Sequence, residues 1–194
     1  MARTFISEQA RIEYVASRLY VRTLASRYLG VGQREIELRK NLKGKPRLID
    51  PRGARSYRLN ISMSHCIKGV AIAFGRKVRV GVDLEMSRQP SAITAAVARS
   101  LTGVERNLTT PHQIWDCWAR KEALLKGLGL GLSGLDCAPS LESQINVVKS
   151  GAVMWTVASL SLGADCSLAY AVEGIRPRIR LFTCRSYTTI NRSF

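Results

Sequence analysis

The sequence has no run of 18 apolar residues, and its opening residues, Met-Ala-Arg-Thr-Phe-Ile-Ser-Glu, lack the apolar centre of a signal peptide. The five cysteines are odd in number and widely spaced, and no two of them form a Cys-x-x-Cys pair. This usage argues against both a disulfide framework and a structural zinc site. We therefore expect a soluble, cytoplasmic protein in a reducing compartment, with no membrane partner.

Aromatic residues are scarce, at 7% of the chain, and no helix-turn-helix, RRM-like or zinc-finger pattern can be read. Charge is strongly unbalanced, because 30 Lys and Arg stand against 14 Asp and Glu, a net charge of +16. Residues 1–60 hold 14 of the basic residues and 5 of the acidic ones, so we expect an anionic partner near the first third. Nucleic acid is the less favoured anion, because aromatic residues are few and no nucleic-acid-binding pattern is present. A polyphosphate cofactor or an acidic protein explains the charge equally well.

The composition, with 46% apolar and 23% charged residues among 194, is that of a globular protein with a sizeable core. Sequence periodicity predicts a helix followed by strands, twice over. The expected helices are 7–29, 91–101 and 112–128, and the expected strands are 36–39, 60–64, 69–74, 76–84, 147–148, 153–160, 167–172 and 178–184. This order predicts an α+β fold of two similar halves, residues 1–86 and 87–194.

Two short segments place carboxylates where they could act together. Asp83 and Glu85 are two apart in a predicted strand, so their side chains leave the same face. Glu122 and Lys126 are four apart in a predicted helix, so they also share a face. Carboxylates too few to enclose a cation suit Mg²⁺ when substrate phosphates complete its coordination. Taken singly, each pair is more typical of a solvated strand end or a surface ion pair; their occurrence together favours a site.

The two segments, Gly81-Val-Asp-Leu-Glu85 and Trp118-Ala-Arg-Lys-Glu-Ala-Leu-Leu-Lys126, resemble the paired signature of the 4′-phosphopantetheinyl transferases. The resemblance is to the larger, monomeric branch typified by the surfactin-synthetase activator. Three upstream or intervening segments are similar to further elements of the family, in its order: Gly44-Lys45-Pro46, Asn60-Ile-Ser-Met-Ser64-His65 and Leu101-Thr-Gly-Val-Glu105, with Leu101 where Phe is usual.

This resemblance implies a pseudo-twofold pair of halves with coenzyme A in the cleft between them. The implied reaction transfers the 4′-phosphopantetheine arm of coenzyme A to a serine of an acidic carrier protein and releases 3′,5′-ADP. Asp83, Glu85 and Glu122 would bind Mg²⁺, or alternatively Mn²⁺. Lys126 would stabilise developing phosphate charge, and Glu122 would be the base, with Glu105 as the alternative.

The resemblance also implies which residues bind the nucleotide. Lys45 and Pro46 would lie against the adenosine end, and Ser64 and His65 would contact phosphates. On the first predicted helix, Arg18 and Arg22 are four apart and repel each other unless an anion lies nearby. We expect the cofactor's 3′-phosphate or the carrier protein to be that anion, and a solvated helix face is the alternative.

The glycines at 127, 129 and 131 follow a predicted helix rather than precede one, so we interpret them as a helix stop and a lead into the next strand. Fatty-acid, polyketide and peptide carriers all remain open as partners. The competing functional class is a basic, non-catalytic binding protein, either for nucleic acid or as a scaffold. The presence of three acidic candidate ligands together with Lys126 favours the enzyme.

Overall fold

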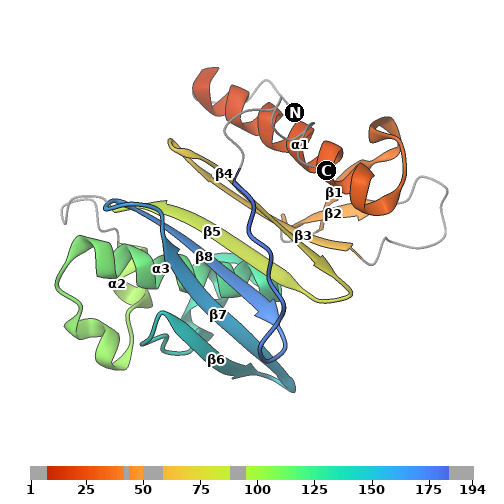
Figure 1. The fold of residues 1–194 in the computed structure, drawn as a ribbon. Coiled ribbons are helices and arrows are strands. Elements are labelled where there is room, and N and C mark those ends of the chain that lie inside the picture. The colour runs from red at the N-terminus through yellow and green to blue at the C-terminus, as the bar shows by residue number, and fades with distance from the viewer. Residues whose placement is uncertain (1–7, 42–43, 50–58, 88–94, 184–194) are drawn as a thin grey trace.

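The fold was analysed in a computed structural model that describes residues 8–41, 44–49, 59–87 and 95–183 (Figure 1). It opens with α1 (Glu8–Leu29), which agrees with the helix predicted over 7–29; the first residue of that prediction, Ser7, lies outside the described residues. Gly30 ends α1 in a left-handed conformation, with φ of +66°. The amide of Val31 then donates to the carbonyl of Ser26 at 3.1 Å, which satisfies an otherwise orphaned carbonyl of the last turn.

Two antiparallel ribbons follow α1. A short 3₁₀ turn, η1 (Gln33–Glu35), leads into β1 (Glu37–Lys40) and β2 (Pro46–Ile49), which pair with each other. The second ribbon pairs β3 (Leu59–Cys66) with β4 (Gly69–Arg76). Strand β2 was not predicted, because it has only four residues and begins at a proline, which cannot donate to a ladder. The buried apolar residues of α1 and both ribbons form one cluster: Val21, Ala25, Ile36, Leu48, Leu59 and Ile61.

A four-stranded antiparallel sheet joins the two predicted halves. It is built from β5 (Val80–Met86), β6 (Ile145–Ser150), β7 (Val153–Ser161) and β8 (Cys166–Glu173), in the order β5-β8-β7-β6. Strand β5 ends at residue 86, the last residue of the predicted first half, and it pairs along its whole length with β8 of the predicted second half. The sheet therefore places residues of the early segment beside those of the late one.

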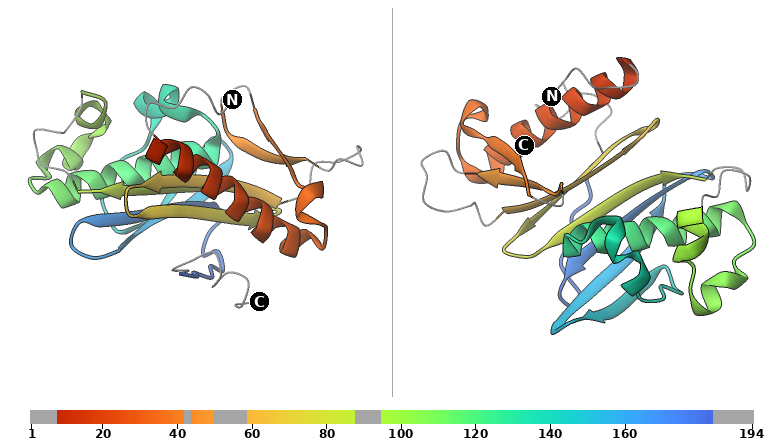
Figure 2. Two further views of the ribbon diagram at one scale, coloured as in Figure 1. Left: turned by 90° about the horizontal axis from the view of Figure 1, so that it is seen from above. Right: turned by 180° about the vertical axis from the view of Figure 1, so that it is seen from behind.

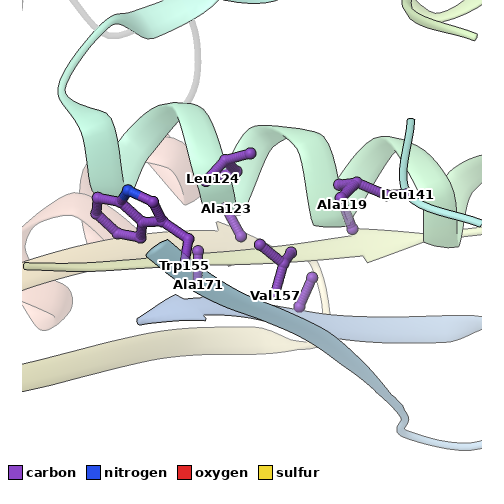
Figure 3. Packing of buried hydrophobic residues seen from close by; sticks show 8 residues of the cluster. Ala119, Ala123, Leu124, Leu141, Trp155, Val157 and Ala171 are labelled. Carbon is purple, nitrogen blue, oxygen red and sulfur yellow. The ribbon is translucent and has the colours of Figure 1, made fainter. Parts of the chain in front are cut away.

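Helix α3 (Pro111–Leu128) covers one face of this sheet, and the β3–β4 ribbon covers part of the other (Figure 2). Small residues at the interface let α3 lie close to the strands, as Figure 3 shows for Ala119, Ala123 and Ala171 around Trp155 and Val157. On the opposite face, β5 and β8 pack against Ala71 and Ala73 of β4. The remaining helices are short: α2 (Ala95–Ser100), η3 (Gly103–Asn107) and η4 (Gly131–Cys137).

The α+β class is confirmed, and two local predictions are wrong. Residues 178–183 form no strand: they are mostly exposed, alternate basic and apolar side chains, and follow Pro177. Gly129 does end α3 as predicted, with φ of +76°, but Gly131 opens η4 rather than a strand. Within the part of the chain that the structure describes, no helix is long and apolar enough to span a bilayer.

Candidate active site

Asp83 is at the centre of the site and is only 3% exposed. Its Oδ1 accepts a hydrogen bond from Ser64 Oγ of β3 at 2.8 Å, and it forms an ion pair with Lys126 Nζ of α3 at 2.5 Å. The same ammonium donates to Ser64 Oγ at 3.0 Å. Strands β3 and β5 and helix α3 thus meet at three polar atoms, which form a closed hydrogen-bonded triangle.

The close approach of α3 to β5 depends on two glycines. A Cβ atom on Gly81 would lie 1.8 Å from the carbonyl oxygen of Ala123, which is part of the helix backbone and cannot move aside. A Cβ atom on Gly127 would lie 2.7 Å from the ring of Trp155. Gly127 is therefore a packing residue within α3 rather than its stop. Without these glycines, Lys126 would lie farther from Asp83.

Glu122 lies one turn before Lys126 on α3 and lines a cleft. Burial raises the pKa of Glu122 to about 7, and the neighbouring charge of Asp83 adds to this effect more than Lys126 offsets it. Its Oε1 atom is buried and accepts no hydrogen bond from the part of the chain that the structure describes, and the same is true of Oδ2 of Asp83. Two carboxylates therefore each keep one buried oxygen without a protein donor.

Glu85 leaves β5 two residues after Asp83, on the same face. Its Oε1 accepts a hydrogen bond from Trp118 Nε1 of α3 at 3.2 Å, and its charge contributes to the raised pKa of Glu122. Trp118, which sequence reasoning placed only on the shared helix face, thus orients one of the three candidate ligands. The sequence shows that Trp118 offers an indole N–H donor, but it does not show that Glu85 accepts this hydrogen bond.

The side chains present fit a cation in charge and in ligand type. Among residues 8–41, 44–49, 59–87 and 95–183, no three Asp, Glu, His or Cys side chains form a ready-made metal-binding group. However, Asp83 and Glu122 each keep an oxygen without a donor, and their mutual repulsion is relieved only in part by Lys126. Hard oxygen ligands with remaining charge repulsion are suited to a divalent cation that also takes ligands from a substrate.

The cleft beside this cluster has a volume of about 280 Å³. It is lined by Gly44, Lys45, Pro46, Ser62, Met63, Glu122, Lys126, Gly129, Gly131 and Leu132. Lys45 Nζ donates to the carbonyls of Val80 at 3.1 Å and Gly127 at 2.9 Å, so that it links β2 to β5 and to the end of α3. Burial, followed by the charges of Arg79 and Arg47, lowers the pKa of Lys45 to about 8.

Some predicted site residues lie apart from this cleft. Arg18 and Arg22 line a second hollow, of about 200 Å³, on α1. The guanidinium of Arg18 stacks 4.4 Å from the ring centroid of Tyr14. His65 is exposed and leaves β3 on the face opposite Ser64, because successive side chains of a strand alternate.

Glu105, the alternative base, is 1% exposed and has no open oxygen. Its Oε2 accepts from Lys121 Nζ at 2.6 Å and from the Thr102 amide at 2.8 Å, and its Oε1 accepts from the Leu141 amide at 2.6 Å. Burial alone would raise the pKa of Glu105, but these hydrogen bonds outweigh it and hold the pKa below its usual value. Glu105 and Lys121 form a buried ion pair that ties η3 to α3.

Sequence reasoning missed the role of one face of β3. Asn60, Ser62 and Ser64 alternate along the strand and all bond toward β5 or the turn before it. Asn60 Nδ2 donates to the carbonyl of Val78, and Ser62 Oγ accepts from the amide of Val82. These side chains connect two strands that belong to different sheets. The signal was present as polar residues at every second position of an otherwise apolar strand.

Comparison with known proteins covers the same segments. The sequence model of the 4′-phosphopantetheinyl transferase superfamily matches residues 79–168, which include the β5 carboxylates and the whole of α3. Over 185 residues, the chain is 26% identical to the 4′-phosphopantetheinyl transferase HetI of Nostoc sp., a match that covers 89% of this chain and 76% of the relative. Residues 79–168 of this chain are thus similar to the 4′-phosphopantetheinyl transferase superfamily over the segment that carries Asp83, Glu85, Glu122 and Lys126.

Two further proteins named as phosphopantetheinyl transferases are also similar to this chain. The phosphopantetheinyl transferase of Thraustochytrium sp. is 29% identical over 150 residues, covering 67% of this chain and 50% of the relative. The L-aminoadipate-semialdehyde dehydrogenase-phosphopantetheinyl transferase of Pongo abelii is 24% identical over 131 residues, covering 61% of this chain and 42% of the relative. The chain thus spans about half or less of the length of these two proteins.

Proposed function

We propose that this chain transfers the phosphopantetheine arm of coenzyme A to a serine hydroxyl of a carrier protein. The observation that carries the proposal is the cluster of Asp83, Ser64 and Lys126, with Glu122 beside it at the cleft. The ammonium can contact a diphosphate directly. The carboxylate oxygens without a protein donor can hold a divalent cation that also takes ligands from the diphosphate. The similarity to phosphopantetheinyl transferases supports this kind of reaction.

In the proposed reaction, the serine oxygen attacks the phosphorus that bears the pantetheine arm. The bond between this phosphorus and the bridging oxygen of the diphosphate breaks, and 3′,5′-ADP leaves with that oxygen. Lys126 is 29% exposed at its side chain and is held by Asp83, so its ammonium can also contact phosphate oxygens from the cleft. A positioned cation stabilises charge that develops in the transition state.

The serine proton must be accepted by a base, since an alcohol is a weak nucleophile at neutral pH. We assign this role to Glu122 rather than Glu105. Glu122 lines the cleft and keeps one oxygen without a donor among the described residues, so it can accept a proton from a hydroxyl placed there. Glu105 already accepts four hydrogen bonds, from Lys121, from Leu141 and from both the amide and the hydroxyl of Thr102, and its lowered pKa makes it a poor proton acceptor. Its contacts favour a structural role.

Asp83, Glu85 and Glu122 are the residues that would hold Mg²⁺ or Mn²⁺. Such a cation neutralises and orients a diphosphate when it is bound. The two unpartnered oxygens and the raised pKa of Glu122 support this assignment.

Coenzyme A would lie in the 280 Å³ cleft, which β2 and β3 of the early segment and α3 of the late segment line together. We propose that residues 1–86 and 87–194 are the two pseudo-symmetric halves of the family fold. Lys45 and Pro46 line the cleft and would contact the adenosine end. We retain His65 as a phosphate contact at the rim, and Arg18 and Arg22 as a surface for the 3′-phosphate or the carrier.

Intact-mass spectrometry of an apo carrier protein tests the proposal. After incubation with this protein, coenzyme A and Mg²⁺, the carrier is expected to gain the mass of one phosphopantetheine, with 3′,5′-ADP as the second product. Acyl, polyketide and peptidyl carriers should be compared, because the chain does not specify one. No mass gain with any of them, together with tight nucleic-acid binding, would favour the basic binding protein instead.

A further inference from the structure

Two cysteines far apart in the sequence meet where the β3–β4 ribbon packs on the larger sheet. Cys66 is the last residue of β3, and Cys166 is the first residue of β8. Cys166 is 2% exposed and belongs to a buried cluster with Leu84 and Leu168, and Cys66 packs against this cluster while remaining partly exposed. Both are free thiols.

An ion pair holds the same two segments together. Lys68 Nζ lies 2.5 Å from Asp165 Oδ1, and these residues are two after Cys66 and one before Cys166. Strands β3 and β8 belong to different sheets, so no backbone ladder joins them. The ion pair is exposed and weak, so it marks the two cysteine segments as neighbours, while the packing of Cys66 on the buried cluster holds them together.

We propose that Cys66 and Cys166 form a redox-active dithiol site, which a low-molecular-weight disulfide oxidises to an intramolecular disulfide. The Cys66 thiolate attacks one sulfur of the oxidant, forming a mixed disulfide and releasing one thiolate. The Cys166 thiolate then attacks Cys66 Sγ, forms the internal bond and releases the second thiolate. The oxidant gains two electrons, and the two cysteine protons end on its two thiols.

The surroundings set the order of these steps. Cys66 is the more accessible thiol and would react first. Burial, followed by the neighbouring Cys66 thiol, raises the pKa of Cys166 to about 11, with smaller and opposed effects of Lys68 and Asp165. The buried Cys166 is therefore the slower nucleophile and closes the internal bond in the second step. Cys117 is not a competitor, because it is buried on α3 and burial raises its pKa to about 12.

The bond would close a loop of about a hundred residues, and loops of this length give disulfides their largest expected stabilisation. For a chain of this size the melting temperature should rise by roughly 4–16 °C on oxidation. This effect is independent of the proposed transferase activity.

The test uses the full chain with Cys137→Ser and Cys184→Ser, which removes the exposed thiol of η4 and the one outside the described residues. Oxidised glutathione should yield a monomer in which peptides containing Cys66 and Cys166 are linked. The melting temperature should rise, and dithiothreitol should reverse both changes. Adding Cys66→Ala should abolish the link and the shift, and adding Cys166→Ala should leave glutathione on Cys66.

Two results would overturn the proposal. One is a stable glutathione adduct on Cys66 in the protein that retains Cys166, with no linked peptide. The other is two thiols that stay unmodified until the protein is denatured. Both results are measured on the Cys137→Ser, Cys184→Ser protein that keeps Cys66 and Cys166, so a further variant that fails to fold does not affect the outcome.

Discussion

Glu122 experiences two unfavourable effects at once, burial and the charge of neighbouring carboxylates, and both favour its protonated form. In water its carboxyl would titrate near 4.5, whereas in the fold it titrates at about 7. The native state thus binds this proton more tightly than the unfolded chain. The cost of ionising Glu122 in the fold is the feature that a bound cation would relieve.

The sign of the resulting pH dependence can be tested without a metal. Between pH of about 4.5 and about 7, the native state keeps the Glu122 proton that the unfolded state has lost, so the free energy of unfolding should fall as pH rises. The total fall should be at most about 3 kcal/mol, with no further change above the native pKa. Glu122→Gln should remove this slope in urea unfolding with EDTA present. Equal slopes in the two proteins would contradict the shift.

Asp83 and Lys126 should differ in what their loss affects. Asp83→Ala should weaken Mn²⁺ binding and abolish turnover, because it removes a proposed ligand. Lys126→Ala should leave Mn²⁺ binding nearly intact and lower turnover by roughly 10²–10³, the usual loss for one positioned donor. Metal titration and steady-state rates separate the two effects.

Lys68→Ala is the matched control, because its ion pair with Asp165 is exposed and contributes little. It should change neither metal binding nor turnover. Equal losses of metal binding in Asp83→Ala and Lys126→Ala would contradict the assigned roles.

At the scale of elements, the sequence predicts more of the site's local geometry than of its assembly. The strand alternation around Asp83 and Glu85 and the helical spacing of Glu122 and Lys126 could both be read from the sequence. Helix α3 formed as predicted, and β5 formed over Val80–Met86 instead of the predicted 76–84. The hydrogen bonds from the polar face of β3 toward β5 could not be read from the sequence, because they depend on which strands pack together. The buried pairing of Glu105 with Lys121 likewise depends on how η3 docks against α3.

Gly81→Ala tests how closely α3 must approach β5. Its new Cβ would overlap the Ala123 carbonyl oxygen, so α3 has to shift. We expect the free energy of unfolding to fall by about 3 kcal/mol, as for a severe overpacking substitution, with a loss of turnover as Lys126 moves. Chemical unfolding and rate measurements at a temperature where both proteins are folded would show this.

Gly32→Ala serves as the control for that substitution, since its Cβ would meet only the flexible end of the Glu35 side chain. It should change stability far less and leave turnover unaffected. Similar effects of the two substitutions would show that the close approach is not required.

At the scale of the whole molecule, the net charge of +16 is not explained by the cleft. Arg18 and Arg22 lie at a separate hollow on α1, which makes a long-range role in attracting an acidic partner the natural explanation. Such attraction weakens with salt, because the Debye length falls from about 10 Å at 0.1 M to about 3 Å at 1 M.

The KM for the carrier should therefore rise with salt much more than the KM for a small serine peptide. Charge reversal at Arg18 and Arg22 should raise the carrier KM, whereas Lys149→Glu, at an exposed position of β6, should have a smaller effect. A rise in the coenzyme A KM alone would assign the arginines to the nucleotide. No change in either KM would leave them as a solvated helix face.

The rate of a single turnover in two variants tests the central claim most directly. With saturating coenzyme A, Mg²⁺ and apo carrier, Glu122→Gln should lower the transfer rate by roughly 10²–10⁴, the range for loss of a general base. Glu105→Gln should reduce the folded fraction but keep most of the rate per folded molecule, because Glu105 holds η3 to α3. A lower transfer rate per folded molecule in Glu105→Gln than in Glu122→Gln would contradict the account and assign the role of base to Glu105.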